Sequence, residues 1–411
     1  MTQCLVCKFN IQPFISFGQM PVANGFLKEE EFAGEFFSEL EVGFCLRCYA
    51  AQLTRLLDPE RLYHDDYLYY SSTSTGMVRH FRKFAIEATS DFLQVDDPFV
   101  VEIGSNDGIM LQNFAQAGVR HLGVEPSKKV AQEAIRNGVA TRHSFFDLKV
   151  AADIVEQQGQ ADLIYSANVI SHISDIHTVI SGLGKLLKDS GVFILEDPYL
   201  GDIVQKTTFD QFYDEHVFYF CASSLSNLLA QHSMEIISVA PQSVHGGSMR
   251  YVIAKQGARP VRQEVMQLMG QEVSIGLNQE ETFHTLKERI YATKGSLTDL
   301  LNDLKQAGKR VVGYGATAKS TTLTNFSGIG PDLLEYITDT TPEKQGRYSP
   351  GTHIPVVSHE RFCEDYPEYA LLLAWNHQDE ILAKETDFIK QGGKFIVYVP
   401  SVDILGAPSH P

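Results

Sequence analysis

The densest group of side chains capable of acid–base chemistry is the run Tyr213-Asp214-Glu215-His216. A histidine titrates near neutral pH and can serve as a general base. A neighbouring carboxylate can orient the ring and stabilise its cationic form. We therefore predict a catalytic role for His216, with Glu215 as its orienting partner and Tyr213 beside it. The competing interpretation is that His216 is a core histidine with satisfied hydrogen bonds.

A second candidate site is the loop that follows the apolar run Phe99–Ile103. The run predicts a buried strand, then a glycine turn, then a helix over residues 109–117. The turn reads Glu-x-Gly-x-x-x-Gly from Glu102 to Gly108, and it lacks the tight pyrophosphate turn of dinucleotide-binding folds. It resembles the S-adenosylmethionine loop of class I methyltransferases. The alternative is a generic α/β turn with a structural glycine.

Residues at the carboxyl ends of the following predicted strands could complete the binding site for a nucleotide-sized cofactor. A strand at residues 121–125 ends at Glu125, which is placed to accept hydrogen bonds from a ribose diol. Phe146 and Asp147 follow where an aromatic ring and an acid commonly meet adenine, and a fourth strand, residues 161–168, leads to Asn168 and His172. The residues expected at the cofactor are Glu102, Gly104, Ser105, Asn106, Asp107, Gly108, Glu125, Pro126, Phe146, Asp147 and Asn168.

The cysteines near the N-terminus form two Cys-x-x-Cys pairs, Cys4 with Cys7 and Cys45 with Cys48. Four thiolates are the tetrahedral set that zinc takes in structural sites, and they leave no position for a reactive water. We predict a structural zinc site, with a strand at residues 39–44 between the two pairs. The alternative is four reduced cysteines in a core.

Tyrosines and hydroxyl residues crowd the segment 63–74. This composition suits a loop that lies over a sugar or a cofactor, with Tyr67, Tyr69, Ser71 and Ser72 facing the ligand. A tyrosine-rich surface turn is the alternative. Ser74 or Thr75 could then cap a helix over residues 77–92.

The C-terminal part begins with another strand–glycine–helix loop, at residues 309–320. Backbone N–H groups and Lys319 at a helix N-terminus predict a diphosphate site, although the Walker A spacing is absent. The alternative is a purely structural turn. Strands are expected at residues 333–338, 370–374 and 394–399, with a helix over residues 379–391. Helical periodicity over residues 258–308 predicts a linker before this unit.

Length and charge limit the classes of function. A chain of 411 residues predicts two or three domains, which we place at residues 1–63, 64–257 and 258–411. The formal net charge of −17 argues against a nucleic-acid partner. The sequence contains no run of about twenty apolar residues, so it predicts no membrane span. The first residues lack the features of a signal peptide. We therefore expect a cytoplasmic protein, as a monomer or small homo-oligomer.

Taken together, the motifs resemble those of the sugar C-methyltransferases, which methylate C3 of nucleotide-linked 4-keto-deoxysugars. The matching segments are the two cysteine pairs, the loop from Glu102 to Gly108, residues 213–218, residues 245–248 and the loop from Gly313 to Lys319. They follow the family order over essentially the whole chain. One departure is Thr317, where the family more often has proline.

The resemblance implies an α/β fold with a zinc-binding module, a central Rossmann-like methyltransferase domain and a second Rossmann-like domain. It implies that His216 removes the C3 proton, that Tyr213 and His172 polarise the keto oxygen, that Glu215 orients His216, and that Tyr67 closes over the sugar. S-adenosylmethionine would supply the methyl group and the substrate would carry a thymidine diphosphate. The residues expected at this substrate are Tyr69, Ser71, Ser72, His245, Gly247, Ser248, Tyr314, Ala316, Lys319 and Asn376.

Two other functions remain open at this point. An O- or N-methyltransferase acting on a sugar or small molecule needs the same cofactor loop but no acidic carbon beside a ketone. A non-catalytic binding protein could keep a zinc module and a degenerate methyltransferase fold. Which of His216 and His172 is the base also remains open.

Overall fold

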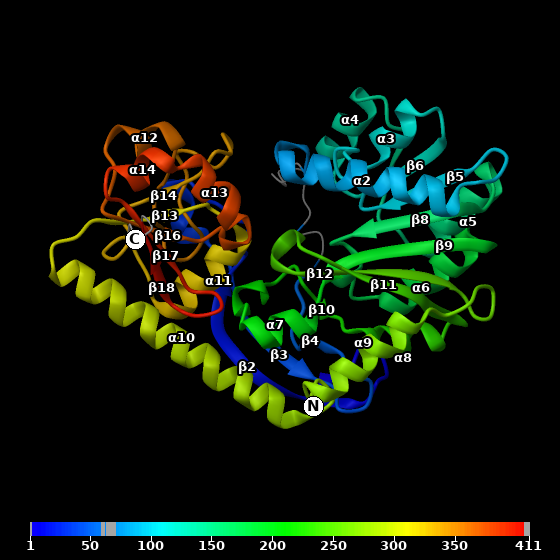
Figure 1. Cartoon of the computed structure of the whole chain (residues 1–411), viewed down its shortest axis with the longest axis horizontal. Coiled ribbons are helices and arrows are strands. Elements are labelled where there is room, and N and C mark those ends of the chain that lie inside the picture. Colours follow the sequence, from blue (N-terminus) through cyan, green and yellow to red (C-terminus); the bar gives the residue numbers. More distant parts are fainter. Residues whose placement is uncertain (1, 59–61, 63–70, 407–411) are drawn as a thin grey trace, which may run out of the picture.

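The computed structural model describes residues 2–58, 62 and 71–406. These residues form three sheets with helices packed against them, which confirms the α/β class (Figure 1). No helix within these ranges combines the length and apolar character needed to cross a bilayer.

The N-terminal sheet is antiparallel and has the order β1-β2-β3-β4-β10. Its last strand comes from far along the chain, so the zinc module shares a sheet with the central part of the protein. The expected strand at residues 39–44 is confirmed within β3. The strands are β1 (Thr2–Gln3), β2 (Asn10–Pro21), β3 (Phe37–Phe44), β4 (Ala51–Leu53) and β10 (Phe218–Tyr219).

The central sheet has seven strands in the order β11-β12-β9-β8-β5-β6-β7. Strands β7, β6, β5, β8 and β9 are parallel, whereas β12 and β11 are antiparallel to their neighbours. All five residues of β5 are buried, as expected for a central parallel strand covered on both faces. The strands are β5 (Phe99–Ile103), β6 (Arg120–Glu125), β7 (Thr141–His143), β8 (Ala161–Ala167), β9 (Leu187–Pro198), β11 (Met234–Gln242) and β12 (Ser248–Lys255).

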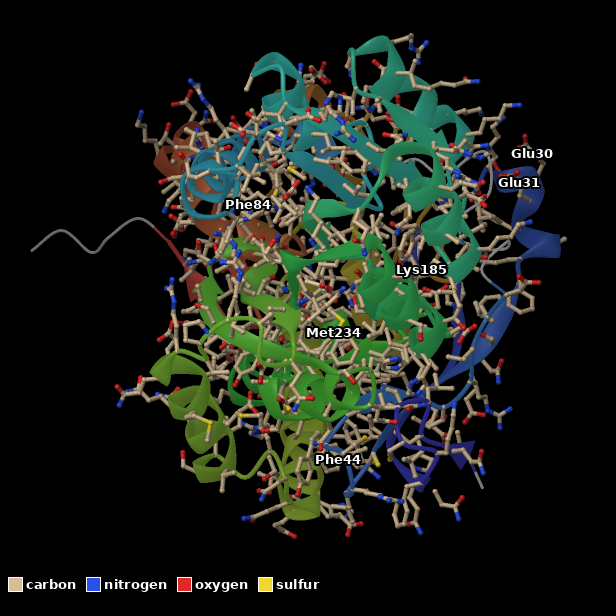
Figure 2. All side chains as sticks on the ribbon, turned by 90° about the vertical axis from the view of Figure 1, so that its right-hand side faces the viewer. Glu30, Glu31, Phe44, Phe84, Lys185 and Met234 are labelled. Atoms are coloured by element: carbon tan, nitrogen blue, oxygen red, sulfur yellow. The ribbon has the colours of Figure 1, made fainter. Side chains whose placement is uncertain are left out.

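Helices cover both faces of the central sheet (Figure 1). Helix α2 (Thr75–Phe92) begins after Ser74, whose side chain accepts a hydrogen bond from the Met77 N–H, so Ser74 is its N-cap. Figure 2 shows Phe84 in the upper part of the molecule and Met234 below it. The helices are α2 (Thr75–Phe92), α3 (Leu111–Gln116), α4 (Lys128–Arg136), α5 (Leu148–Gln158), α6 (Ile176–Leu186), α7 (Leu200–Lys206) and α8 (Ala222–Ala230).

Two linker helices follow, α9 (Gln263–Ser274) and α10 (Glu280–Gln306), and they confirm the predicted helical periodicity. Helix α10 runs along the lower edge of the molecule from the N-terminal sheet to the C-terminal unit (Figure 1). Phe283 of α10 stacks on Phe44 of β3 with ring centroids 3.9 Å apart. Phe44 is labelled in the lower part of Figure 2. The linker is therefore packed against the zinc module.

The C-terminal sheet has the order β15-β14-β13-β16-β17-β18, parallel except for β18. The strand expected at residues 333–338 is shorter than predicted, because residues 331–333 form a turn. The strands are β13 (Val311–Tyr314), β14 (Ile337–Thr338), β15 (Val356–Val357), β16 (Tyr369–Leu372), β17 (Lys394–Val397) and β18 (Asp403–Leu405).

The single helix predicted over residues 379–391 is wrong. Glu385, with φ −92° and ψ 35°, separates two helices there. Its carboxylate is buried and accepts a hydrogen bond from the Tyr314 hydroxyl, a tertiary contact that local sequence does not encode. The helices of this unit are α11 (Ala318–Ser327), α12 (His359–Glu364), α13 (Gln378–Lys384) and α14 (Thr386–Lys390).

Candidate active site

A cavity of about 470 Å³ lies between the carboxyl ends of the central and C-terminal sheets. The loops after β5, β6, β8 and β9 line one side, and the loops after β13 and β16 line the other. Asn24, from the connection after β2, reaches the same cavity. Ligands of open parallel sheets bind at the carboxyl ends of the strands, so the cavity has the expected position for a binding site.

His216 and Tyr213 lie together at this cavity. The Tyr213 hydroxyl is 2.6 Å from Nε2 of His216, and Nδ1 of His216 is 3.1 Å from the Gln211 carbonyl. A carbonyl only accepts, so Nδ1 carries the proton and Nε2 is the basic nitrogen. The Tyr213 hydroxyl therefore donates to Nε2. The structure thus places His216 and Tyr213, both predicted site residues, next to each other at the cavity.

Glu215 does not meet the expected ring nitrogen. Its Oε1 accepts a hydrogen bond from Nδ2 of Asn24 at 2.5 Å, while the Gln211 carbonyl holds Nδ1 of His216. Glu215 is buried and lines the cavity. The group that holds Nδ1 is thus the backbone carbonyl of Gln211, the last residue of η4 (Phe209–Gln211), and not the predicted carboxylate.

His172 lies at the end of η3 (Ile170–His172), which follows β8. Its ring centroid is 4.9 Å from that of His216, and it lines the same cavity. Burial lowers the pKa of His172 to about 4. The imidazole is therefore neutral at pH 7 and is a weak base there.

The loop after β5 forms a narrow cradle. Gly104 has a φ of +69°, and a Cβ atom built on it would overlap the side chain of Val169. Glycine is therefore required both by the backbone conformation and by the close approach. Gly104, Ser105 and Asn106 line the cavity, whereas Gly108 does not and packs against Val139.

Two buried carboxylates face the cavity beside this loop. Glu125 accepts hydrogen bonds from the N–H groups of Asn106, at 2.9 Å, and Ser127, at 2.8 Å. Burial raises its pKa to about 7. Oε2 of Glu102 is buried and has no hydrogen-bond partner among the described residues, and burial raises the pKa of Glu102 well above its usual range.

Apolar side chains complete this side of the cavity. Phe145 and Phe146 line it next to Pro126, and Asn168 lies at the carboxyl end of β8. A glycine cradle, acidic groups and a flat apolar surface fit the ribose, the cationic methionine end and the adenine of S-adenosylmethionine. The orphaned oxygen of Glu102 is the observation that most calls for a ligand there.

Asp147 does not reach this cavity. Its carboxylate accepts the Val150 N–H at 2.7 Å and forms the N-cap of α5. Aspartate is a favoured N-cap residue, so this local role competes with the predicted contact to adenine. Phe146 points to the cavity and Asp147 to the helix.

Ser71 and Ser72 meet the cofactor loop through their backbones. The Ser71 N–H donates to Oδ1 of Asn106 at 2.9 Å, and the Ser72 N–H donates to Oδ2 of Asp107 at 3.0 Å. Ser71 lines the cavity, whereas Ser72 and Asp107 do not. The two serines therefore attach their segment to the loop through their backbone N–H groups, a contact with the protein in addition to the predicted one with the ligand.

The C-terminal side of the cavity is basic. Lys319, on the first turn of α11, and Lys344 both line it, together with Asn376 and His377 of η6 (Trp375–His377). Nζ of Lys344 donates to the Ala316 carbonyl at 2.7 Å. The two lysines stand opposite the acidic loop after β5.

Besides Ser72, four residues predicted at the substrate do not line the cavity. Tyr314 packs against Phe362 in the C-terminal core, and the Ala316 N–H donates to Asp339. Gly247 and Ser248 lie at the start of β12, where a Cβ on Gly247 would overlap Asp202. All four positions are buried, and none of them lines the cavity.

Three further predictions cannot be placed. Tyr67 and Tyr69 lie outside the described residues. His245 falls in η5 (Val244–Gly246), and its side chain is likewise outside the described part of the chain.

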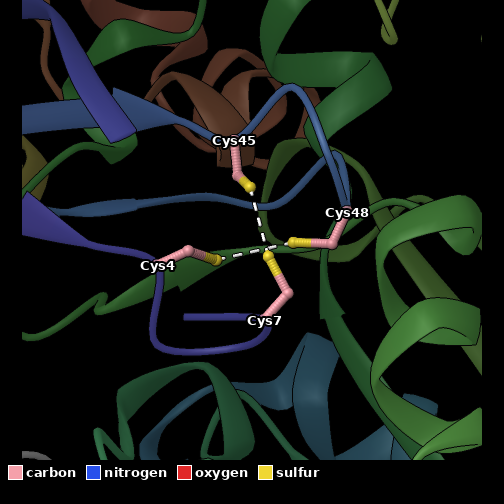
Figure 3. A group of neighbouring side chains, drawn as sticks. All are labelled: Cys4, Cys7, Cys45 and Cys48. Atoms are coloured by element: carbon pink, nitrogen blue, oxygen red, sulfur yellow. Dashed lines mark hydrogen bonds between the residues drawn. The ribbon is translucent and has the colours of Figure 1, made fainter. Parts of the chain in front are cut away.

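The four N-terminal cysteines converge on one point (Figure 3). The Sγ atoms of Cys4 and Cys48, and those of Cys7 and Cys45, are each 3.5 Å apart. Zinc–sulfur bonds of about 2.3 Å in a tetrahedron require sulfur–sulfur distances near 3.8 Å, so the group fits zinc with small adjustments. All four ligand positions are filled by protein, which makes this a structural zinc site.

Several cavity residues were not predicted from the sequence. They include Asn24, Gln211, Lys344 and His377. Gln211 lies two positions before Tyr213, and His377 directly follows the predicted Asn376, so their nearness to predicted residues was the available signal. Asn24 and Lys344 reach the cavity through contacts between distant segments.

Comparisons with known proteins agree with this arrangement. Three domain models match in order: a zinc binding domain at residues 4–63, a methyltransferase domain at residues 77–239 and a C-methyltransferase C-terminal domain at residues 243–400. The C-methyltransferase NovU of Streptomyces niveus is 35% identical over 410 residues, which cover 99% of this chain and 97% of that protein.

Other similarities are partial. A ubiquinone biosynthesis O-methyltransferase of Leptothrix cholodnii is 28% identical over 102 residues, which cover 24% of this chain and 43% of that protein. The solved structure of the magnesium protoporphyrin IX methyltransferase of Synechocystis PCC 6803 has a TM-score of 0.36 at 18% identity, covering 48% of this chain and 92% of that one. The full-length match carries the assignment: this chain belongs to the family of S-adenosylmethionine-dependent C-methyltransferases.

Proposed function

We propose that this enzyme methylates C3 of a nucleotide-diphosphate-linked 4-keto-deoxysugar, with thymidine as the nucleotide. The observation that carries the proposal is the polarity of the cavity. Glu102 and Glu125 line it from the central unit, Lys319 and Lys344 line it from the C-terminal unit, and His216 and Tyr213 line the same cavity. These groups suit a cationic methyl donor, a diphosphate and a reacting sugar, respectively.

The basic side of the cavity supports a diphosphate-bearing substrate. Burial lowers the pKa of Lys319 and of Lys344, while Asp210 opposes that shift at Lys319 and Asp339 opposes it at Lys344. The N-terminus of α11 adds backbone N–H groups beside Lys319. Two lysines and a helix N-terminus provide the charge and donors that a diphosphate requires.

His216 is the proposed base. Its Nδ1–H is held by the Gln211 carbonyl, so Nε2 accepts the proton. The 4-keto group of the sugar acidifies the C3 proton, and removal of that proton leaves an enolate. The low pKa of His172 makes it the weaker candidate for this step.

Tyr213 has two roles in this proposal. In the free enzyme its hydroxyl donates to Nε2 of His216. When the sugar C3–H occupies that position, the hydroxyl is released and donates to the keto oxygen, where negative charge develops. Neutral His172, with its ring 4.9 Å from that of His216, would donate to the same oxygen without repelling the imidazolium that forms.

S-adenosylmethionine, when bound between Glu102, Gly104 and Glu125, supplies the electrophilic methyl group for the enolate. The protein holds the donor and the sugar on opposite sides of one cavity, which makes the transfer effectively intramolecular. Glu215 and Asn24 close the cavity beside His216 through their 2.5 Å hydrogen bond.

The test is solvent exchange at C3. We would incubate the enzyme with a thymidine-diphospho-4-keto-2,6-dideoxy sugar and S-adenosylhomocysteine in deuterated buffer, and follow C3 by NMR. We expect deuterium incorporation by the native enzyme and a loss of about 10²- to 10⁴-fold in His216→Ala. His284→Ala, at an exposed position on α10, is the matched control and should exchange normally.

Two results would contradict the proposal. Exchange that survives in His216→Ala but disappears in His172→Ala would transfer the role of base to His172. An enzyme that turns over this sugar without any C3 exchange would favour O-methylation instead. Titration with S-adenosylmethionine must show that each variant still binds the methyl donor.

A further inference from the structure

A second group of metal-binding side chains lies in the C-terminal unit, away from the cavity. His359 and Cys363 are four residues apart on α12, and Glu385 lies between α13 and α14. One ligand atom from each of the three residues falls within a span of 4.8 Å. Helices α12 and α14 pack together here, as the 5.1 Å separation of the Phe362 and Phe388 rings shows.

The contacts among these three side chains are close. Nε2 of His359 is 2.7 Å from Oε1 of Glu385. Sγ of Cys363 is 3.7 Å from each ring nitrogen of His359. Residues four apart share one face of a helix, so α12 presents the imidazole and the thiol together.

From this geometry we propose that His359, Cys363 and Glu385 form a second zinc-type cation site. Zinc bonds of about 2.0 Å to nitrogen and about 2.3 Å to sulfur place the two ligand atoms near 3.6 Å apart, close to the 3.7 Å found here. Because Sγ is equally far from both ring nitrogens, the Cys363 side chain must rotate toward Nε2 when the metal binds. The distance between Nε2 of His359 and Oε1 of Glu385 must increase by about 0.6 Å, because a metal ion would replace their direct hydrogen bond. Cys363 is exposed, so the fourth position opens to solvent and takes a water.

The surroundings orient the carboxylate as a ligand requires. Glu385 is 3% exposed, and its Oε1 accepts the Tyr314 hydroxyl at 2.7 Å. Ligating carboxylates are normally held by such a second hydrogen bond. Nζ of Lys384 lies 3.7 Å from the same oxygen and must turn outward when a cation binds. Its side chain is about half exposed, which leaves room for that movement.

This site is chemically distinct from the four-cysteine site. Three protein ligands and one water hold a metal less tightly than four thiolates, and the site can therefore be emptied while the structural zinc stays in place. The proposal does not depend on the reaction that the cavity performs.

Cobalt provides the probe. We would treat the full-length zinc-containing protein briefly with a weak chelator, remove the chelator, and titrate it with Co²⁺ without oxygen. We expect one additional equivalent of cobalt, visible d–d absorption of a four-coordinate ion and a sulfur-to-cobalt charge-transfer band. Zinc content, measured in parallel, should remain at one per chain.

Variants assign the signal. Cys363→Ser should abolish the charge-transfer band, and His359→Gln should abolish stoichiometric binding. Tyr314→Phe removes only the hydroxyl that holds Glu385 and should weaken cobalt binding about tenfold. His284→Gln is the matched control, because His284 and Glu280 form a histidine–carboxylate pair, 3.6 Å apart, on α10.

Two outcomes would overturn the proposal. One is that the protein, with its structural zinc in place, binds no cobalt. The other is a charge-transfer band that persists unchanged in Cys363→Ser. Because Cys363 and His359 are at least partly exposed, both variants should fold, and a circular dichroism spectrum would check this.

Discussion

The two glycine loops that face each other across the cavity share one backbone design. Each follows a buried parallel strand, β5 or β13, and each contains a glycine with positive φ, +69° at Gly104 and +95° at Gly315. In both, a Cβ would collide with the neighbouring strand connection, at Val169 or at Ala374. Neither Gly104 nor Gly315 can therefore be replaced by a larger residue without strain.

An acid at the end of the adjacent strand braces each loop in the same way. Glu125 accepts the N–H groups of Asn106 and Ser127. Asp339 accepts the N–H of Ala316 at 2.7 Å and that of Thr341 at 2.8 Å. The carboxylate therefore has a structural role in both units, in addition to any contact with a ligand.

The loops differ in charge. Glu102 and Glu125 face the cavity from the first, whereas Lys319 and Lys344 face it from the second. The backbone thus decides where a ligand can approach, and the side chains decide its charge. The following predictions test that division.

The largest effect should come from the loop glycines. Gly104→Ala and Gly315→Ala each add backbone strain and a steric overlap, and we expect each to lower the free energy of unfolding by about 2–5 kcal/mol. Gly118→Ala is the control, since Gly118 has a φ of +72° but open space around its Cβ. It should cost only about 1–2 kcal/mol. Denaturant unfolding measures all three, and equal losses would refute the role of close packing.

The next effect separates the two ligands. Lys319→Met and Lys344→Met should each raise KM for the nucleotide sugar about 10- to 100-fold, because a charged hydrogen bond to phosphate is lost. The Kd for S-adenosylmethionine should not change. Steady-state kinetics and calorimetric titration would show this, and a comparable loss of both affinities would contradict the charge division.

A smaller effect should follow from loosening each loop. Glu125→Gln keeps one acceptor oxygen and replaces the other, which accepts a backbone N–H, with an NH2 donor. We therefore expect about tenfold weaker S-adenosylmethionine binding with an unchanged KM for the sugar. Asp339→Asn should raise the KM for the sugar about tenfold and leave the Kd for S-adenosylmethionine unchanged. If either variant affects the ligand of the opposite side, the loops do not act separately.

The smallest predicted effect is a pH dependence of stability. Burial raises the pKa of Glu125 to about 7, so the folded protein keeps a proton that the unfolded chain releases near pH 4.5. Stability therefore falls as the pH rises between these values. Glu125→Gln should reduce that fall by about 1 kcal/mol between pH 5 and pH 6.

Unfolding of the native protein and of Glu125→Gln at both pH values provides the comparison. Asp197 and Asp214, whose pKa values burial also raises to about 7, are present in both proteins and contribute equally. Identical slopes for the two proteins would show that Glu125 is already ionised at pH 5.

The sequence alone predicted those features that depend on residues close together in the chain. The cysteine pairs, the strand–glycine–helix loops and the Tyr213–His216 run have local spacing, and local spacing fixes backbone geometry and chemical type. The α/β class and the N-cap at Ser74 followed from the same patterns.

Tertiary structure decided the partners. The Gln211 carbonyl rather than Glu215 holds His216, Asn24 reaches Glu215 from the N-terminal part, and Lys344 joins Lys319 at the cavity. It also divided the predicted helix at Glu385, where the Tyr314 hydroxyl and His359 meet the carboxylate. The contact between His216 and Gln211 is local but depends on how the backbone turns between them. The contacts of Asn24 and Glu385 join segments far apart in the chain, and only tertiary packing brings them within hydrogen-bonding distance.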